Sequence, residues 1–130
     1  MRNTPLLKLA LLGDAVACAV SGLFLAAGAA ALAVPLGLPE ALLRGAGLAL
    51  LPWAAFLAFT GSRASPSRGA VLAIIGLNTL WVLDSLLLAA GAFGLAPRQL
   101  GAGFILAQAA IAAGFTALQI LALRRAAVAA

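Results

Sequence analysis

The sequence predicts an all-α membrane protein with four transmembrane helices, and three observations lead to this prediction. Apolar residues make up 65% of the chain and charged residues only 8%, against roughly 25% charged residues in an ordinary globular domain. A soluble fold of 130 residues has too little interior to bury that much apolar surface. Segments 15–39 and 99–123 carry no charge, and each is long enough to cross a hydrocarbon core of about 30 Å.

We expect one transmembrane domain over residues 1–130, with helices over residues 6–33, 40–60, 69–92 and 98–123. Proline and glycine, which interrupt or start helices, mark the connections. Pro35 and Pro39 fall between the first two helices, and Gly94 and Pro97 fall between the last two. Segment 61–68 (GSRASPSR) is the most hydrophilic stretch and is predicted to be a loop.

The basic residues predict the orientation of these helices. Two basic residues, Arg44 and Arg98, are expected on one side of the membrane. Six are expected on the other side: Arg2, Lys8, Arg63, Arg68, Arg124 and Arg125. Because cytoplasmic loops retain Lys and Arg, both termini and loop 61–68 are expected in the cytoplasm, with the chain in the cell (inner) membrane. Arg44 is expected to pair with Glu40 one turn earlier.

The same charges limit the partners. Basic residues flank apolar segments and are not interleaved with aromatic residues, so the lipid bilayer is expected as a partner and nucleic acid is not. A cleaved signal peptide is an alternative interpretation of the first segment, because Arg2 and Lys8 precede an apolar run that ends in small residues. Asp14 early in that run, and the length of the run, argue against this alternative.

An internal repeat is also predicted, which makes the fold two tandem, parallel helical hairpins. Segment 23–29 (LFLAAGA) aligns with segment 86–92 (LLLAAGA) at an offset of 63. Segment 45–50 (GAGLAL) aligns with segment 101–106 (GAGFIL) at an offset of 56. Chance agreement between segments rich in Ala, Leu and Gly is the alternative, but two blocks in matching order favour duplication.

Polar residues inside the bilayer are costly and therefore are the candidate functional residues. Four of them are expected at one depth toward the cytoplasmic side, namely Asp14, Asn78, Thr116 and Gln119. A second, smaller layer toward the outer side is expected from Asp84, Ser85 and Gln108. Gly13, Ala17 and Ser21 recur every four residues, and this small-residue face predicts close helix packing.

The two carboxylates within the predicted helices, Asp14 and Asp84, have two alternative interpretations. Asp14, with Asp84 as a second candidate, could carry a proton or a cation through the membrane. Alternatively, both could be hydrogen-bonding groups that hold helices together, which the sequence favours. Trp53 and Trp81 lie away from the predicted helix ends and are expected to be packing residues, with stacking on an aromatic ligand as the alternative.

The residue types that the chain lacks argue against catalysis. There is no His and no Tyr, and three acidic residues, one Cys and one Met are scattered along the sequence. These residues make neither a metal site nor a cofactor site, and no nucleophile has a visible base partner. We therefore expect no enzyme, metal or cofactor. The leading hypothesis is an accessory or scaffolding subunit that packs against itself or a larger membrane complex; the alternative is a small oligomeric transporter or channel.

Overall fold

Four helices form nearly all of the fold: α1 (Pro5–Leu36), α2 (Glu40–Ser62), α3 (Arg68–Ala89) and α4 (Gln99–Ala129). A computed structural model describes residues 2–129, with side chains described as far as residue 126, so Met1 and Ala130 of the predicted domain lie outside the described residues. No strand occurs in that range. Each helix is long and apolar enough to cross a membrane, which confirms the all-α class with four candidate spans.

Several helix ends differ from the predicted ones, for local reasons. α1 runs three residues past position 33 and includes Pro35; it ends where Gly37 takes the left-handed conformation (φ 68°) that closes a helix. α3 ends at Ala89, before Gly91 turns the chain with φ 90°. α4 runs on beyond position 123, because Arg and Ala are strong helix formers. α2 ends at Ser62 and α3 starts at Arg68, so the predicted loop 61–68 is reduced to residues 63–67.

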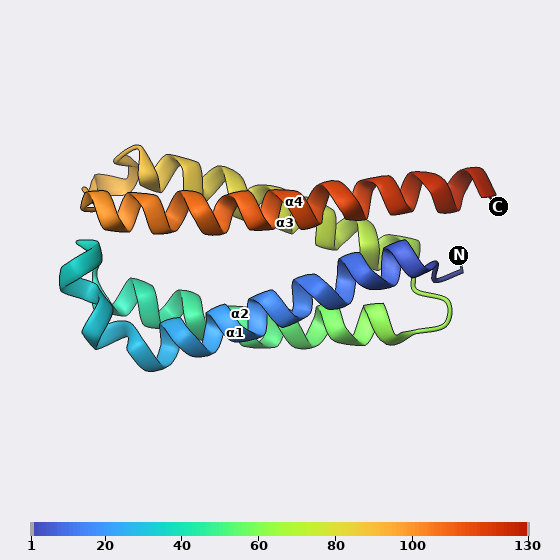
Figure 1. Ribbon diagram of the computed structural model, residues 1–130, viewed down its shortest axis with the longest axis horizontal. Helices are drawn as coiled ribbons and strands as arrows, with labels where there is room; N and C mark the ends of the chain where they lie inside the picture. The colour runs from blue at the N-terminus through green and yellow to red at the C-terminus, as the bar shows by residue number, and fades with distance from the viewer. Residues whose placement is uncertain (1, 130) are drawn as a thin grey trace.

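The helices form two hairpins, α1–α2 and α3–α4, which lie side by side (Figure 1). α1 packs along α2, α3 packs along α4, and α1 against α4 joins the hairpins, whereas α2 and α3 barely meet. Both termini and the 63–67 connection lie at one end, here called the terminal end; the connections at 37–39 and 90–98 lie at the other, the hairpin end. The origin of the hairpins by duplication stays a prediction.

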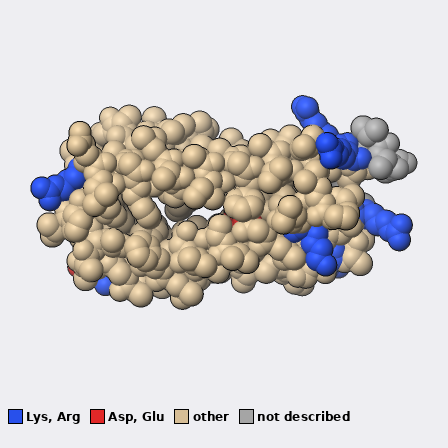
Figure 2. All heavy atoms as spheres, in the orientation of Figure 1, with Lys and Arg blue, Asp and Glu red and all other residues tan. Residues whose placement is uncertain are grey.

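Charge is distributed unequally between these two ends. Blue basic side chains gather at the terminal end of the molecule, on the right of Figure 2. At the hairpin end, Arg44 forms the expected ion pair with Glu40 at 2.8 Å. The guanidinium of Arg98 donates to the carbonyl oxygen of Val34 at 3.3 Å.

Two separate apolar cores stabilise the two ends of the bundle. At the terminal end, buried leucine, isoleucine, valine and alanine side chains of all four helices pack together, including Leu7, Leu57, Ile74 and Leu123. At the hairpin end a second core forms from α1, α2, α4 and the α1–α2 connection, including Leu25, Leu36, Leu43 and Ile105. Partly buried Cys18 and Trp53 pack against both cores in the middle of the bundle, and Figure 2 shows an opening there between the hairpins.

The surface of the bundle is apolar and its interior carries polar groups. Large apolar side chains point outward, among them Leu9 (63% exposed) and Val16 (64%), whereas Asp14 (3%) and Gln119 (0%) are buried. This inverts the usual arrangement of a soluble protein, in which charged residues are almost never fully buried. Together with the four candidate spans, it indicates a multi-pass membrane protein.

Glycines allow the closest helix contacts. A Cβ on Gly47 of α2 would lie against the backbone nitrogen of Ala26 and 2.7 Å from the carbonyl oxygen of Gly22, both in α1. A Cβ on Gly101 of α4 would collide with the carbonyl oxygen of Leu36. The first contact fixes the α1–α2 crossing, and the second holds the hairpins together at the hairpin end.

Candidate functional site

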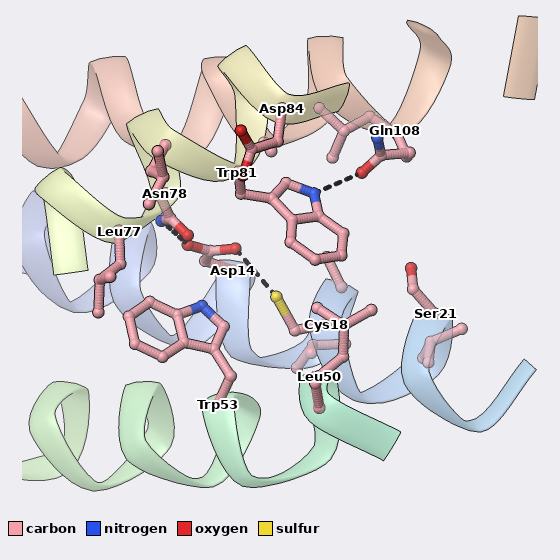
Figure 3. Close-up of a pocket in the computed structure, with 17 residues that line it drawn as sticks. Asp14, Cys18, Ser21, Leu50, Trp53, Leu77, Asn78, Trp81, Asp84 and Gln108 are labelled. Carbon is pink, nitrogen blue, oxygen red and sulfur yellow. Dashed lines mark hydrogen bonds between the residues drawn. The ribbon is translucent and has the colours of Figure 1, made fainter. Parts of the chain in front are cut away.

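A cavity of about 630 Å³ lies between the two hairpins, where the apolar cores leave the bundle unfilled. All four helices line it, because α2 and α3 diverge from one another while α1 and α4 stay in contact. Figure 3 shows the side chains that face it, chiefly Asp14, Cys18, Ser21, Leu50, Trp53, Asn78, Trp81, Asp84 and Gln108. The wall is largely apolar, so the few polar groups in it define the chemistry of the site.

A buried hydrogen-bonded cluster, here called the Asp14 cluster, joins three helices at one side of the cavity. The Oδ2 of Asp14 (α1) accepts from the Nδ2 of Asn78 (α3) at 2.8 Å and from the Nε2 of Gln119 (α4) at 2.8 Å. The Nδ2 of Asn78 also donates to the Oε1 of Gln119 at 3.3 Å. All three side chains are at most 5% exposed, so each hydrogen bond lies in a protected, low-dielectric setting.

The cluster supplies hydrogens to the Asp14 carboxylate from several directions. The thiol of Cys18, one turn along α1, donates to its Oδ1 at 3.5 Å (Figure 3). Gln119 uses its second amide hydrogen on the carbonyl oxygen of Ala10, at 3.4 Å. A carboxylate can only accept hydrogen bonds, so in an apolar environment it requires neighbours that donate them. Asp14 is thus held in one position by groups from three helices.

A second polar group, here called the Trp81 layer, links α3 to α4 nearer the hairpin end. The indole Nε1 of Trp81 donates to the Oε1 of Gln108 at 2.7 Å (Figure 3). The Nε2 of Gln108 donates in turn to the Oγ of Ser85 at 2.9 Å. A smaller cavity of about 300 Å³ lies on the hairpin side and shares Trp81 and Gln108 with the larger one, so this layer forms part of both walls.

The structure places two predicted site residues apart from these groups. Thr116 is buried, but its hydroxyl donates to the carbonyl oxygen of Ala112 in its own helix at 2.8 Å. Asp84 is exposed and lines the cavity, with no hydrogen bond or ion pair to any residue that the structure describes. Of the first predicted layer, the structure therefore connects Asp14, Asn78 and Gln119, and of the second it connects Ser85 with Gln108.

The predicted small-residue face does not make one continuous helix contact. Gly13 lies against the ring of Phe115 in α4, where an added Cβ would approach within 2.8 Å. Ala17 and Ser21, one and two turns further, line the cavity. The close approach of α1 to α2 instead occurs at Gly22, on a neighbouring stripe, against Gly47. Spacing alone could not distinguish these stripes, because α1 carries small residues on most of its faces.

Sequence reasoning missed two contributors to the site. Trp81 was expected to pack, and it also donates the hydrogen bond that orients Gln108. Cys18 lies alone within an apolar segment, where a cysteine usually acts as a small buried hydrophobe, but its thiol donates to Asp14. The available signal was the spacing: Cys18 follows Asp14, and Ser85 follows Trp81, by four residues each, so each pair shares a helix face.

The site has few chemical options. Within the described range no three His, Cys, Asp or Glu residues come together in a way that could hold a metal ion. What the arrangement offers is a mainly apolar space with two carboxylates, two indoles and two amides. Such a space is suited to binding a ligand.

The class of protein that this fold defines is a multi-pass membrane protein with a hollow, partly polar middle. No protein family model, curated protein sequence or solved structure matches the chain.

Proposed function

We propose that the chain is a small membrane transport protein that binds a proton or a cation in the cavity between its hairpins. The observation that supports this proposal is the cavity itself, whose volume of about 630 Å³ falls within the range of roughly 300–1,000 Å³ common for ligand sites. Two of the three acidic residues of the chain, Asp14 and Asp84, line it. The cavity and its two carboxylates therefore support a transporter more strongly than the sequence alone does.

The cost of burying charge in a membrane strengthens the proposal. A carboxylate at the centre of a membrane helix costs about 2.5–3.5 kcal/mol on insertion scales, and such residues usually mark ion or substrate pathways. Asp14 lies nine residues into α1, or about 13 Å along the axis. In this proposal its negative charge makes the cavity attractive to cations, and its hydrogen bonds keep that charge in place.

The contacts between the hairpins provide a route to alternating access. The two hairpins touch in the core of the terminal end and again where Arg98 and Gly101 meet Leu36. Between these two contacts, α2 and α3 barely meet. Two rigid hairpins that rock about one contact would open the cavity toward the other end, as packed bundles do in larger transporters.

The proposed setting is the cell (inner) membrane, with both termini in the cytoplasm and an oligomeric assembly. The six basic residues on the terminal side support that orientation, because Lys and Arg are retained on the cytoplasmic face. The apolar outer surface supports contact with lipid or with other membrane helices.

The test is cation flux into proteoliposomes. Purified protein is reconstituted with an internal pH dye, and proton uptake is followed after a pH or potential step. Wild type is expected to exceed empty liposomes, and Asp14→Asn, which keeps the shape but removes the charge, is expected to lower the flux. Gly45→Ala serves as the matched control, because an added Cβ there meets nothing within 4 Å. Equal, leak-level flux in wild type and Asp14→Asn would contradict transport.

A second candidate function is an accessory subunit of a membrane complex, and the Asp14 cluster favours it. Donors from α3 and α4 occupy the Oδ2 of Asp14, which is how polar groups bind transmembrane helices together. Blue-native electrophoresis of mild-detergent extracts tests this candidate. Complexes larger than the monomer are expected, and migration as a bare monomer alone would exclude it.

A further inference from the structure

We propose that the cavity takes a monovalent organic cation with an apolar body, and that Asp84, rather than Asp14, pairs with its charge. The inference rests on the proposed function in that it places the ligand in the same cavity. It goes further by naming the ligand class and the residue that recognises it. It also reverses the order of importance that the sequence favoured, in which Asp14 was the first candidate and Asp84 the second.

The two carboxylates differ in what already satisfies them. Asp14 accepts hydrogen bonds from Asn78, Gln119 and Cys18. Asp84 accepts none from the part of the chain that the structure describes, although it lines the same cavity. An unpaired carboxylate within a membrane span is costly and needs a counter-charge. The counter-charge is therefore expected to come from the ligand.

The basic residues of the chain do not fill this role. Arg44 pairs with Glu40 at 2.8 Å, and Arg98 donates to a backbone carbonyl of α1. Asp84 lies five residues before the end of α3, about 7.5 Å along the helix axis. A cation that enters from the hairpin end therefore meets Asp84 before it reaches the Asp14 cluster, which is about 9 Å deeper along α3 at Asn78.

The surroundings of Asp84 select the kind of cation. On the same wall of the cavity lie Leu77, Leu80 and the indole of Trp81, with Trp53 on α2 facing them across the space (Figure 3). A small inorganic cation requires several oxygen ligands, and the residues described bring no three acidic or metal-ligating groups together. Leucine and indole surfaces instead favour an organic cation, whose apolar body they cover and whose charge the indole faces attract.

The chain contains its own reporter for this site. It has two Trp and no Tyr, and both tryptophans line the cavity. Tryptophan emission from the protein therefore originates entirely from the walls of the proposed site. A bound aromatic cation is expected to change the intensity or wavelength of that emission without any added label.

The experiment compares two ions of the same shape and opposite charge on the full chain in lipid nanodiscs. Tetraphenylphosphonium and tetraphenylborate are titrated while tryptophan emission is recorded, with empty nanodiscs subtracted for partition into lipid. Wild type is expected to bind the phosphonium at least about tenfold more tightly than the borate, because an ion pair in an apolar setting contributes more than 1.4 kcal/mol. Equal affinity for the two ions would overturn the proposal without any variant.

Variants of Asp84 then test the residue. Asp84→Asn is expected to weaken phosphonium binding about tenfold, and Asp84→Glu, which keeps the charge, is expected to restore most of it. Leu83→Ala, an outward-facing neighbour, serves as the control and should bind as wild type does. Unchanged affinity of Asp84→Asn for the phosphonium would overturn the assignment of Asp84 as the residue that pairs with the cation. The same conclusion would follow if that variant changed the oligomeric state but not the affinity. Cation flux that survives in Asp84→Asn with unchanged phosphonium binding would contradict this inference and leave the transport proposal standing.

Discussion

The Nδ2 of Asn78 lies 2.8 Å from the Oδ2 of Asp14, although 64 positions separate the two residues. The contact connects one hairpin to the other beside the terminal-end core, which includes Leu11, Ala15 and Ile74. Gln119 reaches the same oxygen from α4. One carboxylate thus determines how three helices meet beside the cavity.

Removing the Asn78 donor is predicted to destabilise the bundle. Asn78→Leu keeps a similar volume but leaves Asp14 with one amide donor fewer, so the free energy of unfolding should fall by about 1–2 kcal/mol. Unfolding in mixed micelles of increasing SDS fraction measures this change. Thr79→Ala is the control, because the Thr79 hydroxyl bonds only to its own helix.

A double-mutant cycle separates this contact from simple loss of packing. Asn78 and Gln119 both donate to one oxygen and also contact each other. Asn78→Leu, Gln119→Leu and the double variant should therefore be non-additive, with a coupling of about 0.5–1.5 kcal/mol. Additive losses would show that the amides act independently and that the shared carboxylate is not what links them.

Two glycines of α2 are predicted to respond oppositely to alanine. A Cβ at Gly47 would meet the backbone of Ala26 and Gly22, so Gly47→Ala should push α1 and α2 apart and cost about 1–3 kcal/mol. A Cβ at Gly45 meets nothing within 4 Å, and alanine is the better helix former. Gly45→Ala should therefore be neutral or slightly stabilising. The comparison uses thermal unfolding followed by size-exclusion chromatography; equal losses would contradict the close crossing.

The fold was predictable from the sequence for physical reasons that the site does not share. Four apolar segments of sufficient length leave few alternatives once lipid is the solvent, so the helices could be placed within a few residues. Their ends were less predictable, because Pro35 is accommodated inside α1 and Gly37, not the proline, ends it. Depth along each helix brought Asn78 and Gln119 to the level of Asp14, since rise per residue is constant.

Which neighbours meet at a given depth was not predictable. Thr116 lies near the level of Asp14 but bonds to its own helix, and Asp84 precedes Ser85 yet does not join Gln108. Both outcomes depend on how each helix is rotated about its axis. Nearly uniform apolar helices give weak information about that rotation, because polar and apolar faces are hardly distinguished. The cavity depends on the same rotation and on the divergence of α2 from α3.

The Trp81 layer gives a prediction on fluorescence and stability together. Gln108→Leu removes the acceptor 2.7 Å from the indole Nε1 of Trp81 and the donor to Ser85. In a Trp53→Phe background, Trp81 is the remaining tryptophan of the chain, and its emission should shift to shorter wavelength as its environment becomes apolar. The stability loss should be about 0.6–1.7 kcal/mol, the range found for hydrogen bonds between membrane helices. An unchanged spectrum would contradict the contact.

The orientation in the membrane gives the last prediction, which is tested by cysteine labelling because the chain has a single native cysteine. Cys18→Ala provides a background without thiols, in which one new cysteine is placed at each end of the bundle. Ala64 lies in the 63–67 connection at the terminal end, and Ala96 lies in the 90–98 connection at the hairpin end. Both are exposed, so a membrane-impermeant maleimide reaches whichever faces the medium.

In intact cells, Ala96→Cys is expected to react with the impermeant reagent, and Ala64→Cys is expected to react only after the membrane is opened. The physical reason is that six basic residues lie on the terminal side against two on the other, and each Lys or Arg resists translocation. Inverted vesicles provide the control, since the two positions should exchange their reactivity there. Labelling of both positions in intact cells would mean a dual orientation. Labelling of Ala64→Cys alone would mean the reverse orientation, in which a cation would first meet Asp84 from the cytoplasmic side.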